Sequence, residues 1–231
     1  MIPTRQTLCG VLFVLVATTV VAQEKSVKPG INDAFKNPNV KDFQGKFEIE
    51  SREVFSKREQ IVAACKIRPG MMVADVGAGT GLFTRLFARA VEANGQVYAV
   101  DISAKFLDHV QKTSREAGLK NITPVLTNQD SVDLPPASVD LAYICDTYHH
   151  FEFPERSLAS LHRAIKPGGR LVVIDFHRIP GKSSPWTLNH VRAGQETVEK
   201  EILSAGFEKT SEVKDLLKDN YFVVFTRHAK P

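Results

Sequence analysis

Hydrophobic positions along this chain follow two different spacings. From residue 73 onward, short apolar runs alternate with stretches in which apolar residues recur three and four positions apart. Short apolar runs bounded by turns are typical of buried strands, and the second spacing is typical of helices. This alternation predicts an α/β fold, a parallel sheet with helices on both faces. The predicted strands cover residues 73–76, 96–100, 122–127, 139–145, 170–176 and 221–226.

In the segments before and between these strands, apolar residues either recur at helical spacing or show no regular spacing. Residues 48–67 predict a helix ahead of the first strand, which Arg68, Pro69 and Gly70 end. Residues 23–46 contain prolines, glycines and several Asn and Asp residues, which predicts an extended tail or linker. Further helices are predicted from apolar positions at Leu82, Phe83, Leu86, Phe87, Ala90 and Val91, at Phe106, Leu107 and Val110, at Leu158, Leu161 and Ile165, and at Val191, Val198, Ile202 and Leu203.

The first residues have a different character. Arg5 precedes a mostly apolar, uncharged run at residues 8–22, which ends in small residues. This layout predicts a secretory signal peptide, because the run is shorter than the ~20 residues that cross a bilayer as a helix. An uncleaved membrane anchor is the alternative. The predicted organisation is a leader or anchor at 1–22, a tail at 23–46 and one domain at 47–231.

Composition limits the expected partners. With 231 residues and 43% hydrophobic content, the chain can bury one full-sized core. The formal net charge of +4 falls to +3 if residues 1–22, with Arg5 and no acidic residue, are removed. Lys and Arg are scattered, so we expect no nucleic-acid partner, and membrane contact only through residues 1–22. Cys65 and Cys145 are interpreted as two buried free thiols, with a disulfide between them as the alternative.

Residues 73–81 read V-A-D-V-G-A-G-T-G, an apolar strand followed by an acidic residue and alternating glycines. Glycine permits positive φ and lets a ligand approach the backbone at a helix N-terminus. A dinucleotide fingerprint, G-x-G-x-x-G, needs a third glycine where this chain has Leu82. Asp75 would also repel a pyrophosphate. The motif therefore favours a cationic or zwitterionic cofactor.

This nonapeptide resembles motif I of the class I S-adenosylmethionine-dependent methyltransferases, an acidic residue followed by G-x-G-x-G. Companion features of that family follow in order: Asp101 ends the next strand, residues 130–135 resemble its D-x-x-x-L-P loop, and a P-G-G turn precedes the fifth strand. The resemblance spans residues 47–227. It implies a Rossmann-like, doubly wound seven-stranded sheet in the order 3-2-1-4-5-7-6, with strand seven antiparallel.

The resemblance also implies S-adenosylmethionine as the cofactor and a set of residues that bind it. Asp101 would accept hydrogen bonds from the ribose hydroxyls, and Asp130 would reach the adenine amino group. The implied cofactor-binding residues are Asp75, Gly77, Ala78, Gly79, Gly81, Asp101, Ile102, Asp130, Ser131 and Asp146.

Candidate chemistry for the methyl acceptor follows the fourth strand, where residues 145–151 read C-D-T-Y-H-H-F. His149 or His150 could act as a general base near neutral pH, and Tyr148 could orient or stack on an acceptor. A structural role for the His pair is the alternative. Asp146 is expected to line the cofactor pocket or to position the acceptor. The (N/D)-P-P-(Y/F) turn of methyltransferases that act on adenine or glutamine amides does not occur here.

Other polar and aromatic residues are weaker candidates. The spacing of cysteines and histidines indicates no zinc site, so we expect no metal. Residues that could face the acceptor or serve the structure alone are Asp175, His177 and Trp186. Residues expected on the solvated surface are Glu50, Arg52, Glu53, His190 and Arg192, with contact to the cofactor or acceptor from the helix at 48–67 as the alternative for the first three.

Three functions are consistent with these features. The first is methyl transfer to a small-molecule or lipid-like acceptor, the second is methylation of envelope proteins, and the third is cofactor binding without transfer. Oligomeric state is not indicated. The leader predicts an exported or anchored protein, whereas S-adenosylmethionine is made in the cytosol, so a cytoplasmic protein with a non-functional leader is the alternative.

Overall fold

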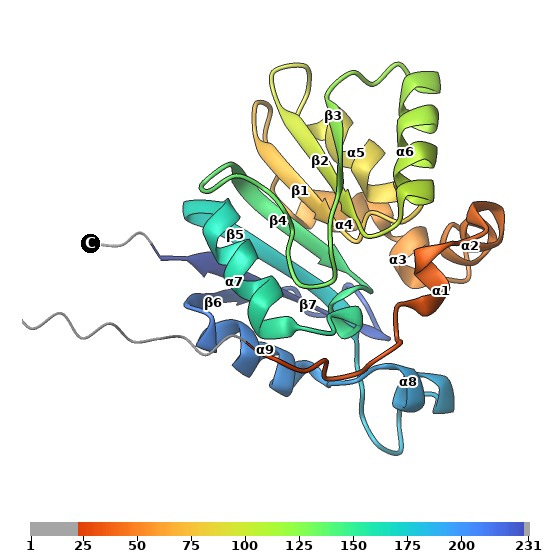
Figure 1. Ribbon diagram of the computed structural model, residues 1–231, viewed down its shortest axis with the longest axis vertical. Helices are drawn as coiled ribbons and strands as arrows, with labels where there is room; N and C mark the ends of the chain where they lie inside the picture. Colours follow the sequence, from red (N-terminus) through yellow and green to blue (C-terminus); the bar gives the residue numbers. More distant parts are fainter. Residues whose placement is uncertain (1–22, 229–231) are drawn as a thin grey trace, which may run out of the picture.

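A computed structural model describes residues 23–228. The predicted leader at residues 1–22 lies outside the described residues. The chain forms a seven-stranded sheet in the order β3-β2-β1-β4-β5-β7-β6 (Figure 1), which confirms the predicted fold. The strands are β1 (Met72–Val76), β2 (Gln96–Asp101), β3 (Ile122–Leu126), β4 (Val139–Cys145), β5 (Ile165–Phe176), β6 (Phe207–Glu212) and β7 (Asn220–Arg227).

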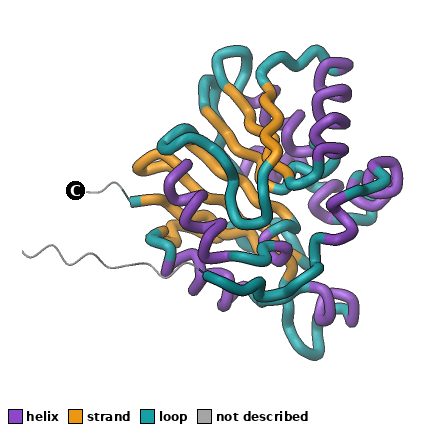
Figure 2. The backbone as a smooth tube through the Cα atoms, in the orientation of Figure 1, coloured by secondary structure: helices purple, strands orange, loops and turns teal. Residues whose placement is uncertain are grey.

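Helices connect these strands and extend the fold at its N-terminus (Figure 2). They are α1 (Asp33–Lys36), α2 (Val40–Phe47), α3 (Glu53–Ser56), α4 (Arg58–Ala64), α5 (Leu82–Ala90), α6 (Ala104–Glu116), the 3-10 helix η1 (Tyr148–His150), α7 (Pro154–Ala164), α8 (Pro185–His190) and α9 (Gln195–Ser204).

Strand direction determines where a ligand can bind. The pairs β1–β2, β2–β3, β1–β4 and β4–β5 are parallel, and β7 runs antiparallel between β5 and β6. From β1 the chain continues to β2 and β3 on one side, and from β4 it continues to β5 on the other side. The boundary between β1 and β4 is therefore the topological switch point. Ligands of open α/β sheets bind beyond the carboxyl ends of the strands at such a point.

Helices cover both faces of the sheet, because alternate residues of each strand point in opposite directions. Ala74 packs on one face in a cluster with Leu158 of α7. Its neighbour Val73 packs on the other face in a cluster with Ile61 of α4 and Phe87 of α5. These two cores hold the strand ends of the switch point in place.

The N-terminal segment differs from its prediction. Residues 23–46 are not an extended tail throughout, because α1 and most of α2 lie within them, on the same side of the molecule as α3 (Figure 1). The Phe43 ring of α2 meets Phe106 of α6 edge-on, with centroids 5.5 Å apart. The Val27 N–H donates to the Glu152 carbonyl at 2.9 Å. Tertiary contacts thus order a segment whose Pro38 and Gly45 suggested a linker.

Two further expectations can be compared with the structure. The helix predicted at residues 48–67 is divided into α3 and α4, which meet at Lys57. Cys65 and Cys145 are free thiols, although Cys145 is only partly buried because it lines the cavity described below. Among residues 23–228, no helix combines the length and apolar character needed to cross a bilayer.

Candidate active site

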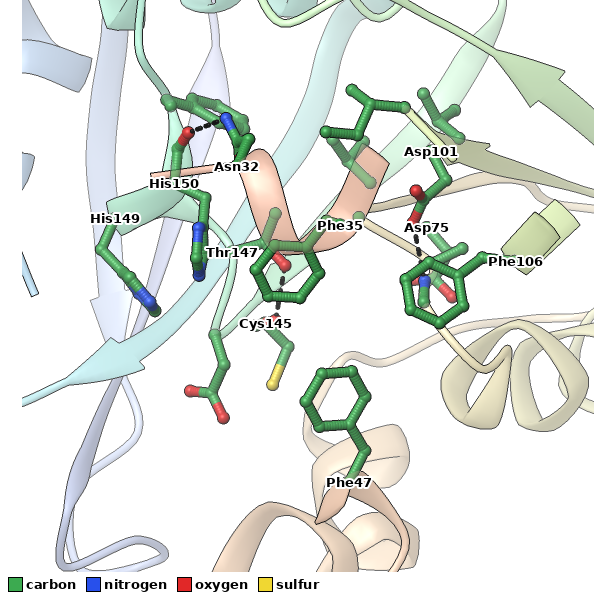
Figure 3. A pocket seen from close by; sticks show the side chains of 18 of the residues that line it. Asn32, Phe35, Phe47, Asp75, Asp101, Phe106, Cys145, Thr147, His149 and His150 are labelled. Carbon is green, nitrogen blue, oxygen red and sulfur yellow. Dashed lines mark hydrogen bonds between the residues drawn. The ribbon is translucent and has the colours of Figure 1, made fainter. Parts of the chain in front are cut away.

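A cavity of about 610 Å³ opens at the switch point. This volume lies within the range of about 300–1,000 Å³ typical of small-molecule and cofactor sites. Figure 3 shows Asp75 and Asp101 on one side, His149 and His150 on the other, and Phe35 between them. Of the predicted site residues, the cavity is lined by Asp75, Gly77, Ala78, Gly79, Asp101, Ile102, Ser131, Asp146, His149 and His150, whereas Gly81, Asp130 and Tyr148 are not among its lining residues.

The three motif glycines have different physical roles, although all adopt positive φ. A Cβ on Gly77 would lie 2.3 Å from Thr147 Cγ2, and one on Gly81 would lie 2.7 Å from Val110 Cγ2. Gly77 and Gly81 therefore allow close packing between elements. A Cβ on Gly79 would meet no atom nearer than 3.7 Å, where the Phe47 ring lies. Gly79 leaves its backbone open to a ligand beneath that ring.

Asp75 and Asp101 end β1 and β2 and are both buried. Thr84 Oγ1 donates to Asp75 Oδ2 at 2.5 Å, and burial raises the pKa of Asp75 to about 7. Asp101 accepts from Gly79 N–H and from Ser103 N–H, both at 2.8 Å, and burial raises its pKa to about 6. Asp101 thus ties the glycine turn to β2, and its oxygens have acceptor capacity left for ligand hydroxyls.

The loop after β3 brings one of its two predicted residues, Ser131, to the cavity, but not the other, Asp130. The Asp130 carboxylate pairs with Arg156 Nη2 at 2.6 Å and does not line the cavity. Asn128, Gln129 and Ser131 line it in this loop. The loop motif pointed to its acidic residue, Asp130. The side-chain amides that line the cavity belong to the two residues before it, Asn128 and Gln129.

Arg52 and Asp146 form an ion pair at the wall of the cavity. Arg52 was expected on a solvated surface, but its guanidinium pairs with the Asp146 carboxylate and lies 5.0 Å from the centroid of Phe47. Asn220 Nδ2 donates to the other Asp146 oxygen. Glu53 is likewise engaged, since it accepts from the N–H groups of Lys218, at 2.7 Å, and of its two successors. Arg52 and Glu53 therefore connect the N-terminal segment to the sheet.

Tyr148 and His149 point in different directions. Tyr148 is fully buried in the core, where its hydroxyl donates to Glu201 Oε2 at 2.8 Å. Contrary to the prediction that it contacts an acceptor, it does not line the cavity. His149 lines the cavity, and Asp175, which is not a lining residue, makes two hydrogen-bond contacts with it. Its backbone N–H donates to Asp175 Oδ2 at 3.0 Å, and its Nδ1 lies 2.7 Å from Asp175 Oδ1. Asp175, left open in the sequence, thus orients the His149 ring.

His150 and His190 complete this end of the cavity. Their Nε2 atoms are 3.4 Å apart, and His190 stacks on Trp186 with centroids 4.7 Å apart. Burial, together with the neighbouring His149, lowers the pKa of His150 to about 2, so its ring is neutral at physiological pH. His190 was expected on the surface, but it lines the cavity.

Three other candidates lie elsewhere. Arg192 is also not a free surface group, since it forms two hydrogen bonds with the Glu201 carboxylate at 2.9 and 2.7 Å. His177 lies against the Tyr221 ring outside the lining residues. Glu50 has an exposed side chain, as expected for a solvated position.

The N-terminal segment supplies a cover that the sequence did not predict. Asn32 donates from Nδ2 to the His150 carbonyl at 3.0 Å, and Phe35 meets the His150 ring edge-on at 4.8 Å. Phe35 continues through Phe43 to Phe47 in a row of ring contacts at 5.1 and 5.3 Å. The sequence feature that could have predicted part of this cover is the four-residue spacing of Phe43 and Phe47, which places them on one face of a helix. Three of these residues, Asn32, Phe35 and Phe47, line the cavity.

Comparisons with known proteins agree with this geometry. Residues 74–173 match the model of a family described as a methyltransferase domain. The chain is 35% identical over 111 residues to the ubiquinone/menaquinone biosynthesis C-methyltransferase UbiE of Psychromonas ingrahamii, covering 48% of this chain and 44% of that protein. The UbiE protein of Ralstonia pickettii is 29% identical over 119 residues, with coverage of 51% and 48%. The chain thus spans about half the length of these relatives.

A solved structure shows the same fold. The S-adenosylmethionine-dependent methyltransferase from Aquifex aeolicus superimposes with a TM-score of 0.73 at 23% identity, covering 82% of this chain and 99% of that one. The family match assigns a methyltransferase domain to residues 74–173, and the strand order and the Aquifex structure show that the described chain has the fold of the class I S-adenosylmethionine-dependent methyltransferases. The cosubstrate of a methyltransferase domain of this kind is S-adenosylmethionine. The open backbone at Gly79 and the carboxylate of Asp101 fit such a ligand.

Proposed function

We propose that the protein transfers a methyl group from S-adenosylmethionine to a small, flat and largely apolar acceptor. The observation that carries this proposal is the continuity of the cavity, which runs from the glycine turn to His150, His190 and Trp186. When bound, S-adenosylmethionine supplies an already activated methyl group. The protein then has to position the acceptor and exclude water.

The residues at the two ends of the cavity support different roles, cosubstrate binding at one end and acceptor binding at the other. Gly79 and Asp101 would hold the cosubstrate, because they offer open backbone and a hydrogen-bond acceptor. The rings of Trp186 and His190 present stacked aromatic surface on which a planar acceptor could lie. The cover formed by Phe35 and Phe47 would exclude water from both.

Enclosure favours a small acceptor over a protein side chain. The N-terminal segment is tied down by Asn32 and Val27 on one side and by Arg52 on the other. A small molecule of the cavity's size fits beneath this segment without displacing these contacts. The UbiE relatives are named for ubiquinone and menaquinone biosynthesis, and quinone rings are planar.

Mass spectrometry with isotopically labelled cosubstrate tests this proposal. Cell extract separated into small-molecule, lipid and protein fractions would be incubated with purified chain and methyl-labelled S-adenosylmethionine. Label is expected in the small-molecule or lipid fraction, and the Asp101→Asn variant should reduce it. Label confined to proteins would favour the alternative of protein methylation, and no label in any fraction, with cosubstrate still bound, would favour a non-catalytic binding protein.

We also propose that the chain is exported or anchored through residues 1–22, on the basis of their basic start and apolar run. Cell fractionation with N-terminal sequencing tests this. A mature protein that begins at Gln23 would support cleavage, and an intact membrane-bound chain would support an anchor. Recovery of the intact chain from the cytosol would contradict both.

A further inference from the structure

Three imidazoles meet at the end of the cavity that lies away from the glycine turn. His149 and His150 come from η1, directly after β4, and His190 is the last residue of α8. One ring nitrogen of each lies within 4.8 Å of the others. His190 is separated from His150 by 40 positions, so sequence spacing gave no indication of this cluster.

We propose that His149, His150 and His190 bind a divalent transition-metal ion, with Zn²⁺ the expected ion. Imidazole is a preferred ligand of Zn²⁺, and tetrahedral Zn–N bonds of about 2.0–2.1 Å place two ligand nitrogens roughly 3.3–3.4 Å apart. His150 Nε2 and His190 Nε2 are already 3.4 Å apart. The widest separation in the cluster, up to 4.8 Å, would have to shorten by roughly 1.4 Å when the ion binds.

Asp175 prepares His149 for this role. A histidine that binds a metal usually passes its other ring N–H to a carboxylate, which fixes the tautomer and the ring orientation. His149 Nδ1 lies 2.7 Å from Asp175 Oδ1, and both side chains are almost fully buried. This contact leaves Nε2 of His149 as the ligand atom. Asp175 is therefore a positioning residue of the site.

Three protein ligands leave one position of a tetrahedral Zn²⁺ open, as in catalytic rather than structural zinc sites. All three histidines line the cavity, so this position would be reached by a molecule bound there. An acceptor with a hydroxyl or thiol would coordinate through its oxygen or sulfur and lose its proton to solvent. This last role rests on the proposed function, whereas metal binding itself does not.

The metal-stripped purified chain tests the site by titration with Zn²⁺ in a calorimeter and with Co²⁺ in a spectrophotometer. One equivalent of Zn²⁺ is expected to bind, and Co²⁺ should give the visible bands of a tetrahedral complex without thiolate charge transfer. His190→Gln should weaken Zn²⁺ affinity by more than about 100-fold, and Asp175→Asn by roughly 10–100-fold with an altered Co²⁺ spectrum. The control His228→Gln, an exposed histidine distant in sequence, should bind as wild type.

The outcomes separate the metal site from the proposed function. Wild-type protein that binds no stoichiometric Zn²⁺ would overturn the site, whatever the variants do. Equal affinity in wild type and His190→Gln would also overturn it, and a thiolate signal would move the ion to a cysteine. Zn²⁺ binding by a protein that fails to bind S-adenosylmethionine would refute the proposed function and leave the metal site standing.

Discussion

The two ends of the cavity are called the cosubstrate end and the acceptor end after the proposed function. At the cosubstrate end, the lining groups follow β1 and β2 directly along the chain. Gly79 lies in the turn after β1 and Asp101 ends the neighbouring parallel strand β2, and a hydrogen bond of 2.8 Å joins them. At the acceptor end, His150, His190 and Trp186 come from segments on either side of β5 and meet through ring contacts. One end is thus built mainly by backbone geometry and the other by the packing of distant side chains.

This difference has a functional consequence. Backbone groups at strand ends tolerate little variation, since their positions follow from sheet register, which suits a site for a constant cosubstrate. Side chains on a loop and a short helix can change without altering the sheet, which suits recognition of variable acceptors. We therefore expect substitutions at the first end to affect stability and cosubstrate binding. Substitutions at the second end should affect neither strongly.

The largest effect is expected for Gly77→Ala. The new Cβ would lie 2.3 Å from Thr147 Cγ2 at a φ of +75°. Backbone strain and overpacking should together lower the unfolding free energy by roughly 2–5 kcal/mol. Urea denaturation measures this. Gly118→Ala is the matched control, because φ is +71° and no atom lies within 4 Å, and it should cost only about 1–2 kcal/mol. Equal losses in the two variants would contradict the steric role of Thr147.

Asp101→Asn should weaken S-adenosylmethionine binding by roughly 10–100-fold, because charged hydrogen bonds contribute about 1.5–3 kcal/mol. Calorimetric titration gives the dissociation constant. Asp130→Asn tests the other carboxylate that the sequence assigned to the cosubstrate. Since Asp130 pairs with Arg156 outside the cavity lining, its replacement should change affinity by less than about threefold. Similar losses in both variants would show that the Asp130 loop turns toward the ligand.

Asp75 makes stability depend on pH. Burial raises its pKa in the folded state to about 7, above the ordinary value of 3.8, so the folded state holds the proton to higher pH. The unfolding free energy should therefore fall as pH rises from about 4 toward 7 and level off above this pKa, with about 1 kcal/mol of the fall remaining between roughly pH 6 and 8. Urea titrations across this range measure the slope. In Asp75→Asn, which keeps an acceptor for Thr84, the slope should become smaller, and an unchanged slope would assign the dependence to other groups.

The smallest effect on stability is expected for Trp186→Ala. Trp186 is 55% exposed and its ring contacts are the stack on His190 and an edge-on contact with Phe176, so the loss should be about 0.5–1.5 kcal/mol. Affinity for S-adenosylmethionine should stay as in wild type, while methyl transfer to the acceptor should decrease. Thermal denaturation and calorimetry measure the first two quantities. A marked loss of cosubstrate affinity would mean that the two ends of the cavity are not independent.

Sequence alone determined the fold and those residues of the cosubstrate end that directly follow β1 and β2. Apolar periodicity depends on local chain geometry, and residues at the ends of parallel strands become neighbours once the sheet forms, so Gly77, Gly79 and Asp101 could be assigned from their positions along the chain. Sequence did not predict whether a side chain after a strand points into the core or into the cavity. Tyr148 and His149 are adjacent, yet one enters the core toward Glu201 and the other faces the cavity.

Only the tertiary structure decided the acceptor end and its cover. The residues that define them belong to η1, α8, and the N-terminal segment containing Asn32 and Phe35. Their meeting depends on how helices and loops pack on the sheet, which no local periodicity encodes. The same packing brought His190 to His150 and turned a segment predicted as a tail into part of the cavity wall. Local sequence patterns therefore predict the part built from strand ends, and long-range side-chain contacts decide the part that receives the acceptor.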